Sequence, residues 1–530
     1  MELDCLFVHV PKMNNRYKPF GDTLYVKSMA IGLLAMADKL QREGFAAQVV
    51  HMGVEYVAGK FDIYEYVRET RARVVGFSLH WHPQSYDVIE TARLVKEKCP
   101  GVFVLLGGLT ASYFSDEIMQ EYKFIDGIIK GDGETPVVSL VDKIKKQDAD
   151  LSTVPNLLWR NVGAVVNNGI SYVAEDEEIN DLNYMSYSLL KNHRIYIDVF
   201  GRSPANYLKG ASPSFNTMRR SKPSVIMPIA RGCSANCKWC GGSAHAHKLN
   251  SGRKRYIFRS YDRVLTDIRQ AQEQGFGILH FAHYSHPDET AYYVELFKAL
   301  RNENIKVDAY FECSALPTRE LVDAFVETFT DRTSSVMCLS RMAPGEKVRK
   351  LNVGRFYTND ELFDILAYMD SKGVRMELTF TLGMPGETED EIPKLVAFRK
   401  KILTGIKHVR SSVVLTSQIE PGSQWFLRPE RFGIQTDLRK FSDFHKFHSI
   451  SNSYYTHLGY SIPGYFRDGK SDSIELFRSR IQSVRCKYFC LLSGNRIGYG
   501  ANVLGRAKCL ALSIFWGLRL GRFLPGRTSN

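Results

Sequence analysis

Short apolar stretches alternate with amphipathic segments over the first 145 residues of the chain. Between the apolar stretches, residues 28–43 and 86–98 repeat apolar positions with helical spacing, and Gly44 closes the first of these segments. This alternation predicts a parallel sheet covered by helices, with ligands at the carboxyl ends of its strands. The stretches typical of buried strands are residues 4–10, 47–50, 74–79, 102–106 and 125–129.

A second series of strand-like stretches, also separated by helical segments, predicts a partial (β/α)6 barrel over residues 221–425. Residues 146–220 are a predicted connecting region with a hairpin around residues 167–169, because an Asn-Gly pair favours a tight turn. We expect residues 426–530 to be α-rich and to shape the substrate pocket. The strand-like stretches of the barrel are residues 224–228, 277–281, 307–311, 335–339, 375–382 and 411–415.

The bulk composition is that of a globular protein with more than one domain. A chain of 530 residues exceeds what one hydrophobic core organises, and 44% hydrophobic and 24% charged residues are ordinary values. The first thirty residues lack a secretory signal, which favours a cytoplasmic location. Ten cysteines, three of them within eight positions, indicate metal binding more than a disulfide framework.

The net charge of +13 is concentrated in a basic tail, where ten basic residues and no acidic residue follow Glu475. Such a tail binds nucleic acid, anionic lipid or an acidic partner, but no nucleic-acid recognition module is recognisable. Its apolar stretch 509–518 has half of the roughly 20 residues that cross a bilayer. Two readings stay open: peripheral contact with the inner face of the membrane, and a buried terminal helix.

The most specific signal is a Cys-x3-Cys-x2-Cys loop of Cys233, Cys237 and Cys240. A structural zinc or an electron-transferring 4Fe-4S cluster normally has a fourth protein ligand, so three cysteines leave one iron open. A zinc site completed by a distant residue and a chance grouping of buried cysteines are the alternatives. With Trp239 before its last cysteine, the loop resembles the radical S-adenosylmethionine (SAM) signature, in which the open iron binds the methionyl group of SAM.

The same resemblance extends to two later segments of the predicted barrel. Residues 382–388 resemble a Gly-x-Pro-Gly-Glu-Thr segment that follows the fifth strand in relatives with a cobalamin-binding domain. Residues 340–351 resemble the segment after the fourth strand, which contacts SAM in the family. A solvated charged face or a structural carboxylate is the alternative for each charged candidate. The implied SAM-binding residues are Ser340, Glu312, Glu346 and Arg349.

Three loops of the N-terminal region are rich in small residues, which permit a close backbone approach to a ligand. Residues 1–145 resemble the cobalamin-binding domain of one class of radical SAM proteins. One departure is that residues 9–14 lack the Asp-x-His-x-x-Gly motif, so no histidine is supplied there for cobalt. His80 and His82 either face the corrin or substrate, or are packing or surface histidines. The implied cobalamin-binding residues are Ser78, Leu79, Gly107, Gly108, Gly131 and Glu134.

The resemblance implies a cobalamin-dependent radical SAM enzyme whose cofactors are a 4Fe-4S cluster, SAM and cobalamin. Its implied activity is C-methylation of an unactivated carbon of a small molecule or lipid through a 5'-deoxyadenosyl radical, with electrons from an external flavodoxin- or ferredoxin-type donor. One alternative is a coupling, cyclisation or rearrangement enzyme without functional cobalamin. Another is a non-catalytic iron-sulfur or cobalamin carrier. The sequence names no catalytic side chain, substrate or oligomeric state.

Overall fold

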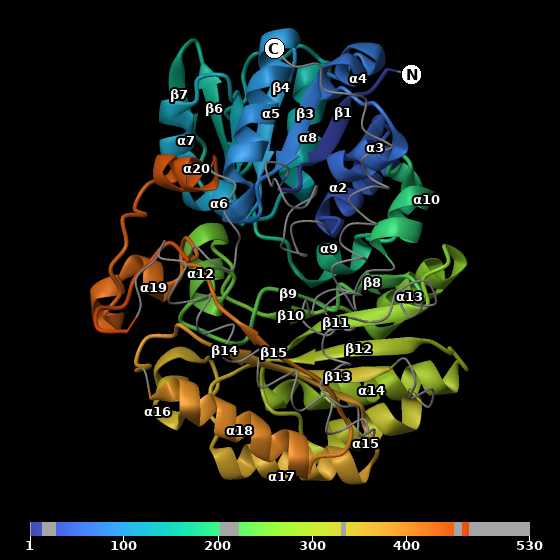
Figure 1. The fold of residues 1–530 in the computed structure, drawn as a ribbon. Coiled ribbons are helices and arrows are strands. Elements are labelled where there is room, and N and C mark those ends of the chain that lie inside the picture. The colour runs from blue at the N-terminus through green and yellow to red at the C-terminus, as the bar shows by residue number, and fades with distance from the viewer. Residues whose placement is uncertain are drawn as a thin grey trace. The chain divides into compact units, whose positions relative to one another are not determined.

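Figure 1 shows the fold in a computed structural model, which describes residues 2–12, 28–201, 222–329, 335–388, 390–449 and 458–465. The basic tail and its apolar stretch 509–518 lie outside the described residues, so the expectations for them stay predictions. Within the described ranges, no helix is long and apolar enough to cross a membrane.

A seven-stranded sheet of order β2-β1-β3-β4-β5-β6-β7 forms the N-terminal domain. Its first five strands are parallel, as predicted, and their 2-1-3-4-5 order is flavodoxin-like, with the switch point between β1 and β3. Ligands of such sheets bind beyond the carboxyl ends of the strands. The strands are β1 (Cys5–His9), β2 (Ala47–His51), β3 (Val74–Ser78), β4 (Phe103–Gly107), β5 (Gly127–Ile129), β6 (Leu157–Asn161) and β7 (Ala164–Asn167).

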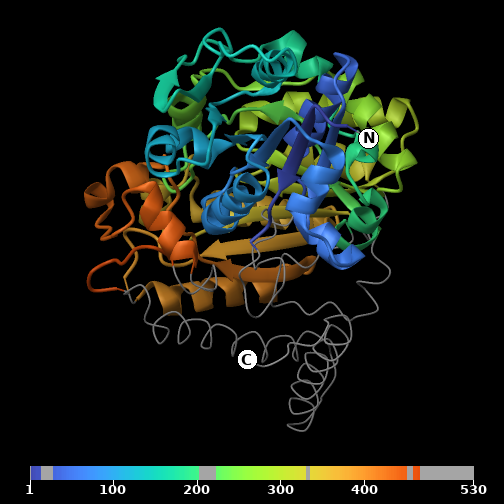
Figure 2. The same cartoon turned by 90° about the horizontal axis from the view of Figure 1, so that it is seen from above.

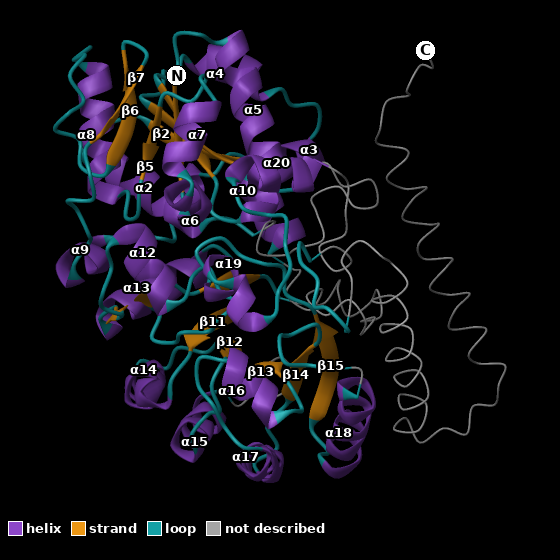
Figure 3. Ribbon diagram, turned by 90° about the vertical axis from the view of Figure 1, so that its left-hand side faces the viewer, coloured by secondary structure: helices purple, strands orange, loops and turns teal. Residues whose placement is uncertain are grey.

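Helices cover both faces of this sheet. Figure 3 shows α2 (Ile31–Arg42) and α8 (Glu134–Lys145) on one side, and α4 (Ile63–Thr70), α5 (Ser85–Lys98) and α7 (Ser115–Glu121) on the other. The predicted helices 28–43 and 86–98 correspond to α2 and α5, which confirms them within a few residues. Two shorter helices complete the domain, α3 (Met52–Ala58) and α6 (Leu109–Tyr113).

The hairpin of the connecting region turns at a different place from the predicted one. Its turn is Val162-Gly163, with φ values of +46° and +87°, and not the Asn168-Gly169 pair. Two positive φ values suit a two-residue turn between twisted strands. Asn168 instead donates two hydrogen bonds of 2.8 Å to backbone carbonyls and fixes the end of β7. Because β6 also pairs with β5, the hairpin extends the N-terminal sheet.

A second sheet has six parallel strands in chain order (Figures 1 and 2). This confirms the predicted partial (β/α)6 barrel. Its strands are β8 (Ser224–Ile226), β11 (Ile278–Tyr284), β12 (Asp308–Cys313), β13 (Val336–Met342), β14 (Met376–Thr381) and β15 (Val409–Leu415). The helices between them are α13 (Tyr261–Glu273), α14 (Thr290–Asn302), α15 (Arg319–Thr328), α16 (Glu346–Asn352), α17 (Asn359–Ser371) and α18 (Glu391–Gly405).

The two faces of this second sheet differ in polarity. Phe281 and Phe311 are fully buried and pack edge to face with Phe297 of α14. Because successive strand residues point to opposite faces, their neighbours His280 and Glu312 lie on the inner face, where His280 Nε2 is 3.4 Å from Glu312 Oε2. Apolar residues therefore anchor the outer helices, and polar residues line the inside of the barrel.

The C-terminal region reaches back to the N-terminal domain. Helix α20 (Phe441–Ser449) packs against α5, and Phe441 and Phe444 contact Phe114. The expected role of this region in shaping the substrate pocket stays a prediction. The remaining described elements are the two-stranded pair β9 (Ala230–Arg231) and β10 (Ile257–Phe258) and the helices α9 (Asp176–Asp181), α10 (His193–Ile195), α12 (Ala244–Ser251) and α19 (Gln424–Leu427), with short helical turns at His82–Gln84, Tyr187–Leu189, Tyr196–Phe200, Pro287–Glu289 and Pro429–Phe432.

Candidate functional site

The cysteine loop connects β9 to α12 at the end of the barrel that faces the N-terminal domain (Figure 1). Gly232 opens it with φ of +93°, a backbone conformation that suits glycine. Cys233, Cys237 and Cys240 are reduced and partly exposed. Burial raises the pKa of the Cys233 thiol, and the nearby Glu289 carboxylate adds to this.

Residues distant in sequence hold the cysteine loop through hydrogen bonds. The backbone N–H of Lys238 donates to the Asn352 carbonyl at 2.9 Å, and that of Trp425 donates to the Lys238 carbonyl at 3.0 Å. The Trp425 indole N–H also donates to Asn352 Oδ1 at 3.1 Å. Trp425 is fully buried, with its ring centroid 6.3 Å from that of Trp239. Neither Asn352 nor Trp425 stands in a local sequence motif that would have identified it.

Two buried carboxylates also hold this loop. Glu420 Oε2 accepts the Gly241 N–H at 2.7 Å, and Glu289 accepts the hydroxyl of Ser234. Glu289 also accepts the Ser285 N–H at 2.9 Å, and burial raises its pKa to about 7. Glu289 lies a few residues after the end of β11, in no recognised motif, and was therefore missed from the sequence.

The donor set of the loop fits a four-iron cluster. Each thiolate of such a cluster binds a different iron, so the three sulfurs need not converge on one point. Among the described residues, no three His, Cys, Asp or Glu side chains are close enough to share a single metal ion. Three thiols on one loop supply ligands for three irons, and the fourth iron is left for a small molecule.

The four predicted SAM-binding residues lie in two different settings. Ser340 lies in β13 where its pairing with β14 shifts register, and such a bulge re-aims a side chain. Glu312 projects from β12 with about a third of its side chain exposed. Glu312 lies on the inner face of the barrel, and SAM contact of both residues stays a prediction.

Arg349 and Glu346 instead fasten the loop after β13. Arg349 is fully buried and donates to the carbonyls of Ala343 and Tyr357, at 2.5 and 3.1 Å, and to Asn359 Oδ1 at 2.8 Å. Glu346 Oε1 accepts the Asn359 N–H at 2.6 Å. These bonds hold the loop in shape, and a direct contact of either residue with SAM stays a prediction.

Two tyrosines from the C-terminal region fix the segment after β14. Tyr460 donates to the Gly383 carbonyl, and Tyr465 donates to Glu387 Oε2, both at 2.7 Å. Glu387 Oε2 also accepts the Gly383 N–H at 2.8 Å. The Gly-x-Pro-Gly-Glu-Thr segment is thus clamped from outside the barrel. Neither tyrosine could be assigned to it from sequence spacing.

Glu387 is expected to make stability depend on pH. Burial raises its pKa to about 8, so the folded state binds this proton more tightly than the unfolded state does. The stabilisation is complete below about pH 4 and is lost as pH rises to about 8, at about 1.4 kcal/mol per pKa unit. Glu387→Gln should flatten chemical unfolding free energies measured between pH 5 and pH 8. The exposed Glu320→Gln is the control, and a parallel pH profile for both variants would contradict the assignment.

The predicted cobalamin loops gather at the carboxyl edge of the N-terminal sheet. Ser78 and Gly107 end β3 and β4 side by side, and the Leu79 N–H donates to the Gly107 carbonyl at 2.8 Å. Gly108 has φ of +106°, and a Cβ there would lie 2.7 Å from His80 Cα. Only glycine fits this position, so the two loops can pack closely and expose backbone to a ligand. This cradle fits the close approach that a corrin or its nucleotide tail requires, although direct contact stays a prediction.

Gly131 and Glu134 lie where the two domains meet. A Cβ at Gly131, whose φ is +70°, would lie 2.8 Å from Ser251 Cβ at the end of α12. Glu134 Oε1 is 2.7 Å from Arg231 Nη2, two residues before the first cysteine of the loop. The structure thus places both residues against the barrel, and cobalamin contact for them stays a prediction.

His80 and His82 differ in their surroundings. Burial lowers the pKa of His80 to about 4 and that of His82 to about 3, so both rings are neutral. His82 is buried with its Nδ1 3.0 Å from Nε2 of His448 in α20, which is a packing role. His80 is half-buried beside the double-glycine loop, where its backbone carbonyl accepts a hydrogen bond of 3.0 Å from the Thr110 hydroxyl. Contact of His80 with a corrin or substrate stays a prediction.

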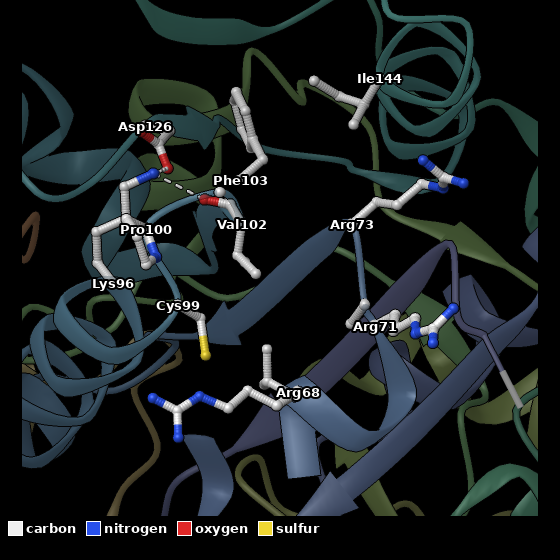
Figure 4. A pocket seen from close by; sticks show the side chains of 13 residues that line it. Arg68, Arg71, Arg73, Lys96, Cys99, Pro100, Val102, Phe103, Asp126 and Ile144 are labelled. Atoms are coloured by element: carbon white, nitrogen blue, oxygen red, sulfur yellow. Dashed lines mark hydrogen bonds and ion pairs between the residues drawn. The ribbon is translucent and has the colours of Figure 1, made fainter. Parts of the chain in front are cut away.

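A cavity of about 520 Å³ lies at the opposite edge of the same sheet (Figure 4). Arg68, Arg71, Arg73 and Lys96 line it, and each has a nitrogen 2.6–3.6 Å from a carboxylate oxygen. It opens beside the residues that precede β3 and β4, whereas the glycine loops follow these strands. The cavity is therefore separate from the candidate cofactor site.

Two family models match the chain. Residues 17–141 match the B12 binding domain, and residues 227–399 match the radical SAM superfamily. Among curated proteins, the chain is 23% identical over 324 residues to an uncharacterized methyltransferase of Pyrococcus horikoshii, which covers 60% of this chain and 62% of the relative. It is 22% identical over 298 residues to the hopanoid C-3 methylase of Methylococcus capsulatus, which covers 54% and 48%. The matched part therefore spans less than two thirds of either relative.

Solved structures share the fold at low sequence identity. The radical SAM methyltransferase TsrM from Kitasatospora setae, with cobalamin and a 4Fe-4S cluster bound, aligns with a TM-score of 0.61 and 13% identity over 91% of this chain and 89% of that one. The cobalamin-dependent radical SAM enzyme OxsB aligns with a TM-score of 0.58 and 13% identity over 90% of this chain and 66% of that one. At this identity the likeness is one of fold.

Proposed function

The chain belongs to the radical SAM proteins that carry a cobalamin-binding domain, and on this premise we propose that it is a cobalamin-dependent C-methyltransferase. Its substrate is a small molecule or lipid that is methylated at an unactivated carbon. The names of two curated relatives, a methyltransferase and a hopanoid methylase, support methyl transfer and make a polycyclic lipid one candidate substrate.

The observation that carries this proposal is the close approach of the two predicted cofactor loops. A Cβ at Gly242 would lie 3.8 Å from both Cys240 Sγ and Leu109 Cδ1, and Leu109 directly follows the double glycine of the N-terminal domain. Helix α6, which begins at Leu109, packs on α12, which follows the cysteine loop. A group held by the glycine loops would therefore lie beside one held by the cysteine loop.

When bound, the cluster with SAM supplies a carbon radical, and cobalamin supplies the methyl group that the substrate receives. The chain's own contribution is orientation and the exclusion of water. Trp425, Asn352 and Glu420 keep the cysteine loop rigid, and the clamped segments after β13 and β14 border the inner face of the barrel. Ser340 and Glu312 are the proposed SAM contacts.

The cofactor content of the full chain tests this proposal first. After anaerobic purification and reconstitution, we expect about four irons and one tightly held cobalamin per chain, read by metal analysis and absorbance. With a low-potential reductant, SAM should yield 5'-deoxyadenosine and S-adenosylhomocysteine in the presence of substrate. Four irons without cobalamin would overturn methyl transfer and favour the coupling or cyclisation alternative. Cofactor binding without SAM cleavage would favour a carrier.

A further inference from the structure

We infer that Asp132 and Glu134 are positioning residues, which fix the loop after β5 to the cysteine loop through Arg231. The inference rests on the proposed function, because it assigns the β5 loop a role in holding cobalamin at a set place relative to the cluster. Arg231 comes two residues before Cys233, and Gly131 comes directly before Asp132. Both partners of this contact are therefore next to predicted cofactor loops.

The contact is a two-pronged ion pair. Arg231 Nη1 lies 2.7 Å from Asp132 Oδ1, and Arg231 Nη2 lies 2.7 Å from Glu134 Oε1. Arg231 Nη2 is also 2.7 Å from the hydroxyl of Tyr184. A planar guanidinium with two fixed acceptors allows far less sliding than a single lysine pair would. The β5 loop is thus held in direction as well as in distance.

A second arginine completes the network. Arg253 Nη2 lies 2.5 Å from Asp132 Oδ2 and donates to the Ala174 carbonyl at 2.6 Å. Asp132 Oδ2 also accepts the Ala174 N–H at 3.1 Å. Asp132 and Glu134 are 7% and 6% exposed, Arg253 is 2% and Arg231 is 20% exposed. Two cations balance two anions away from water, so removing one charge leaves an unpaired buried charge.

The network lies at the contact between the N-terminal domain and the barrel. The Gly131 N–H donates to Ser112 Oγ of α6 at 3.0 Å, and the Gly131 backbone abuts Ser251 of α12. The same two helices bring Leu109 and Gly242 together. Because cofactor-dependent transfer is sensitive to displacements of about 1 Å, a rigid joint at this place would set the distance between the two cofactors.

The matched pair of variants is Glu134→Gln and Arg255→Gln. Glu134→Gln keeps the side-chain shape but removes the charge that faces Arg231. Arg255 lies on the same segment as Arg253, but its partners Glu175 and Asp176 are about as exposed as its own 63%. An exposed ion pair contributes little, so Arg255→Gln is the control for a general loss of charge.

Two measurements on the full-length protein decide the inference. Hydrogen exchange followed by mass spectrometry, on protein without cobalamin, should show faster exchange of residues 131–134 and 232–240 in Glu134→Gln only. After cluster reconstitution, Glu134→Gln should keep its iron but bind cob(II)alamin about tenfold more weakly than wild type. In wild type we expect an electron paramagnetic resonance spectrum with coupling between cob(II)alamin and the reduced cluster, and Glu134→Gln should lose this coupling.

Unchanged exchange in Glu134→Gln would overturn the joint itself, whatever the cofactor content. Faster exchange with wild-type cobalamin affinity and wild-type spin coupling would reduce the network to a merely stabilising contact and overturn the positioning role. Wild-type protein that binds no cobalamin would instead defeat the proposed function, and the exchange measurement would still decide whether the joint exists.

Discussion

Replacing Cys237 by alanine is expected to abolish cluster assembly and, with it, cleavage of SAM. The substitution leaves two thiolates, Cys233 and Cys240, where the cluster needs three. Even changes beyond the ligands of a metal site cost about 10–100-fold, so the loss of a ligand should exceed about a hundredfold. The readouts are iron and sulfide content, the absorbance of the cluster, and 5'-deoxyadenosine formation.

The control is Cys99→Ala, which removes a buried thiol from the N-terminal domain, far in sequence from the loop. It should keep both the iron content and SAM cleavage. Circular dichroism of both variants would separate cluster loss from unfolding. SAM cleavage at wild-type rates by Cys237→Ala would refute the assignment of the loop. Equal loss in both variants would mean that the thiols matter for folding rather than for the cluster.

The parts of the fold that could be predicted are those with a local signal. Strands such as β3 and β4 are short apolar runs ended by glycine or serine, and the cysteine loop is defined by the spacing of three residues. In both cases the information lies within about ten residues, which a periodicity or a motif detects. The positions of the glycine loops at the carboxyl ends of the strands then follow from parallel topology alone.

The supporting residues of the site were missed because they act across long separations. Asn352 and Trp425 hold Lys238 from positions more than a hundred residues away, and neither stands in a recognisable pattern. Arg349 was predicted to contact SAM, with a solvated charged face as the alternative. Its guanidinium is buried and bonded to its own loop, which excludes the solvated face. Charge and spacing show which residues can interact, whereas the packed structure decides which partner each one takes.

Glu134 shows a signal that was present but ambiguous. A Gly-Asp-Gly-Glu loop at a strand end fits ligand binding, yet its carboxylates face Arg231 of the barrel. The Arg231-Gly232 pair that precedes Cys233 was the complementary half of this contact. Both loops are glycine-rich, each lies next to a predicted cofactor site, and their charges are opposite. This complementarity was the indication in the sequence that the two loops contact each other.

Gly108→Ala is expected to remove cobalamin binding while leaving the cluster in place. The Gly108 backbone, at φ +106° and ψ 173°, is a region that residues with a Cβ rarely adopt, and strain of this kind costs about 1–3 kcal/mol. The added Cβ would also lie 2.7–2.9 Å from the backbone of His80 and Leu79, where no flexible side chain can move aside. The loops after β3 and β4 must then separate, and the glycine cradle is lost.

The matched control for this variant is Gly101→Ala. Gly101 lies in the same domain, just before β4, and a Cβ there would meet nothing within 4 Å. Both variants would be reconstituted with iron, sulfide and cobalamin, and cobalamin retained after gel filtration would be read by absorbance. Gly101→Ala should match wild type, whereas Gly108→Ala should retain its iron, lose its cobalamin and unfold at lower temperature. Full cobalamin retention by Gly108→Ala would place the cofactor away from the double-glycine loop.

Because the cluster loop has its own supports in Trp425 and Glu420, its survival in the same sample would show that the two cofactor sites are built separately and meet only at their shared edge.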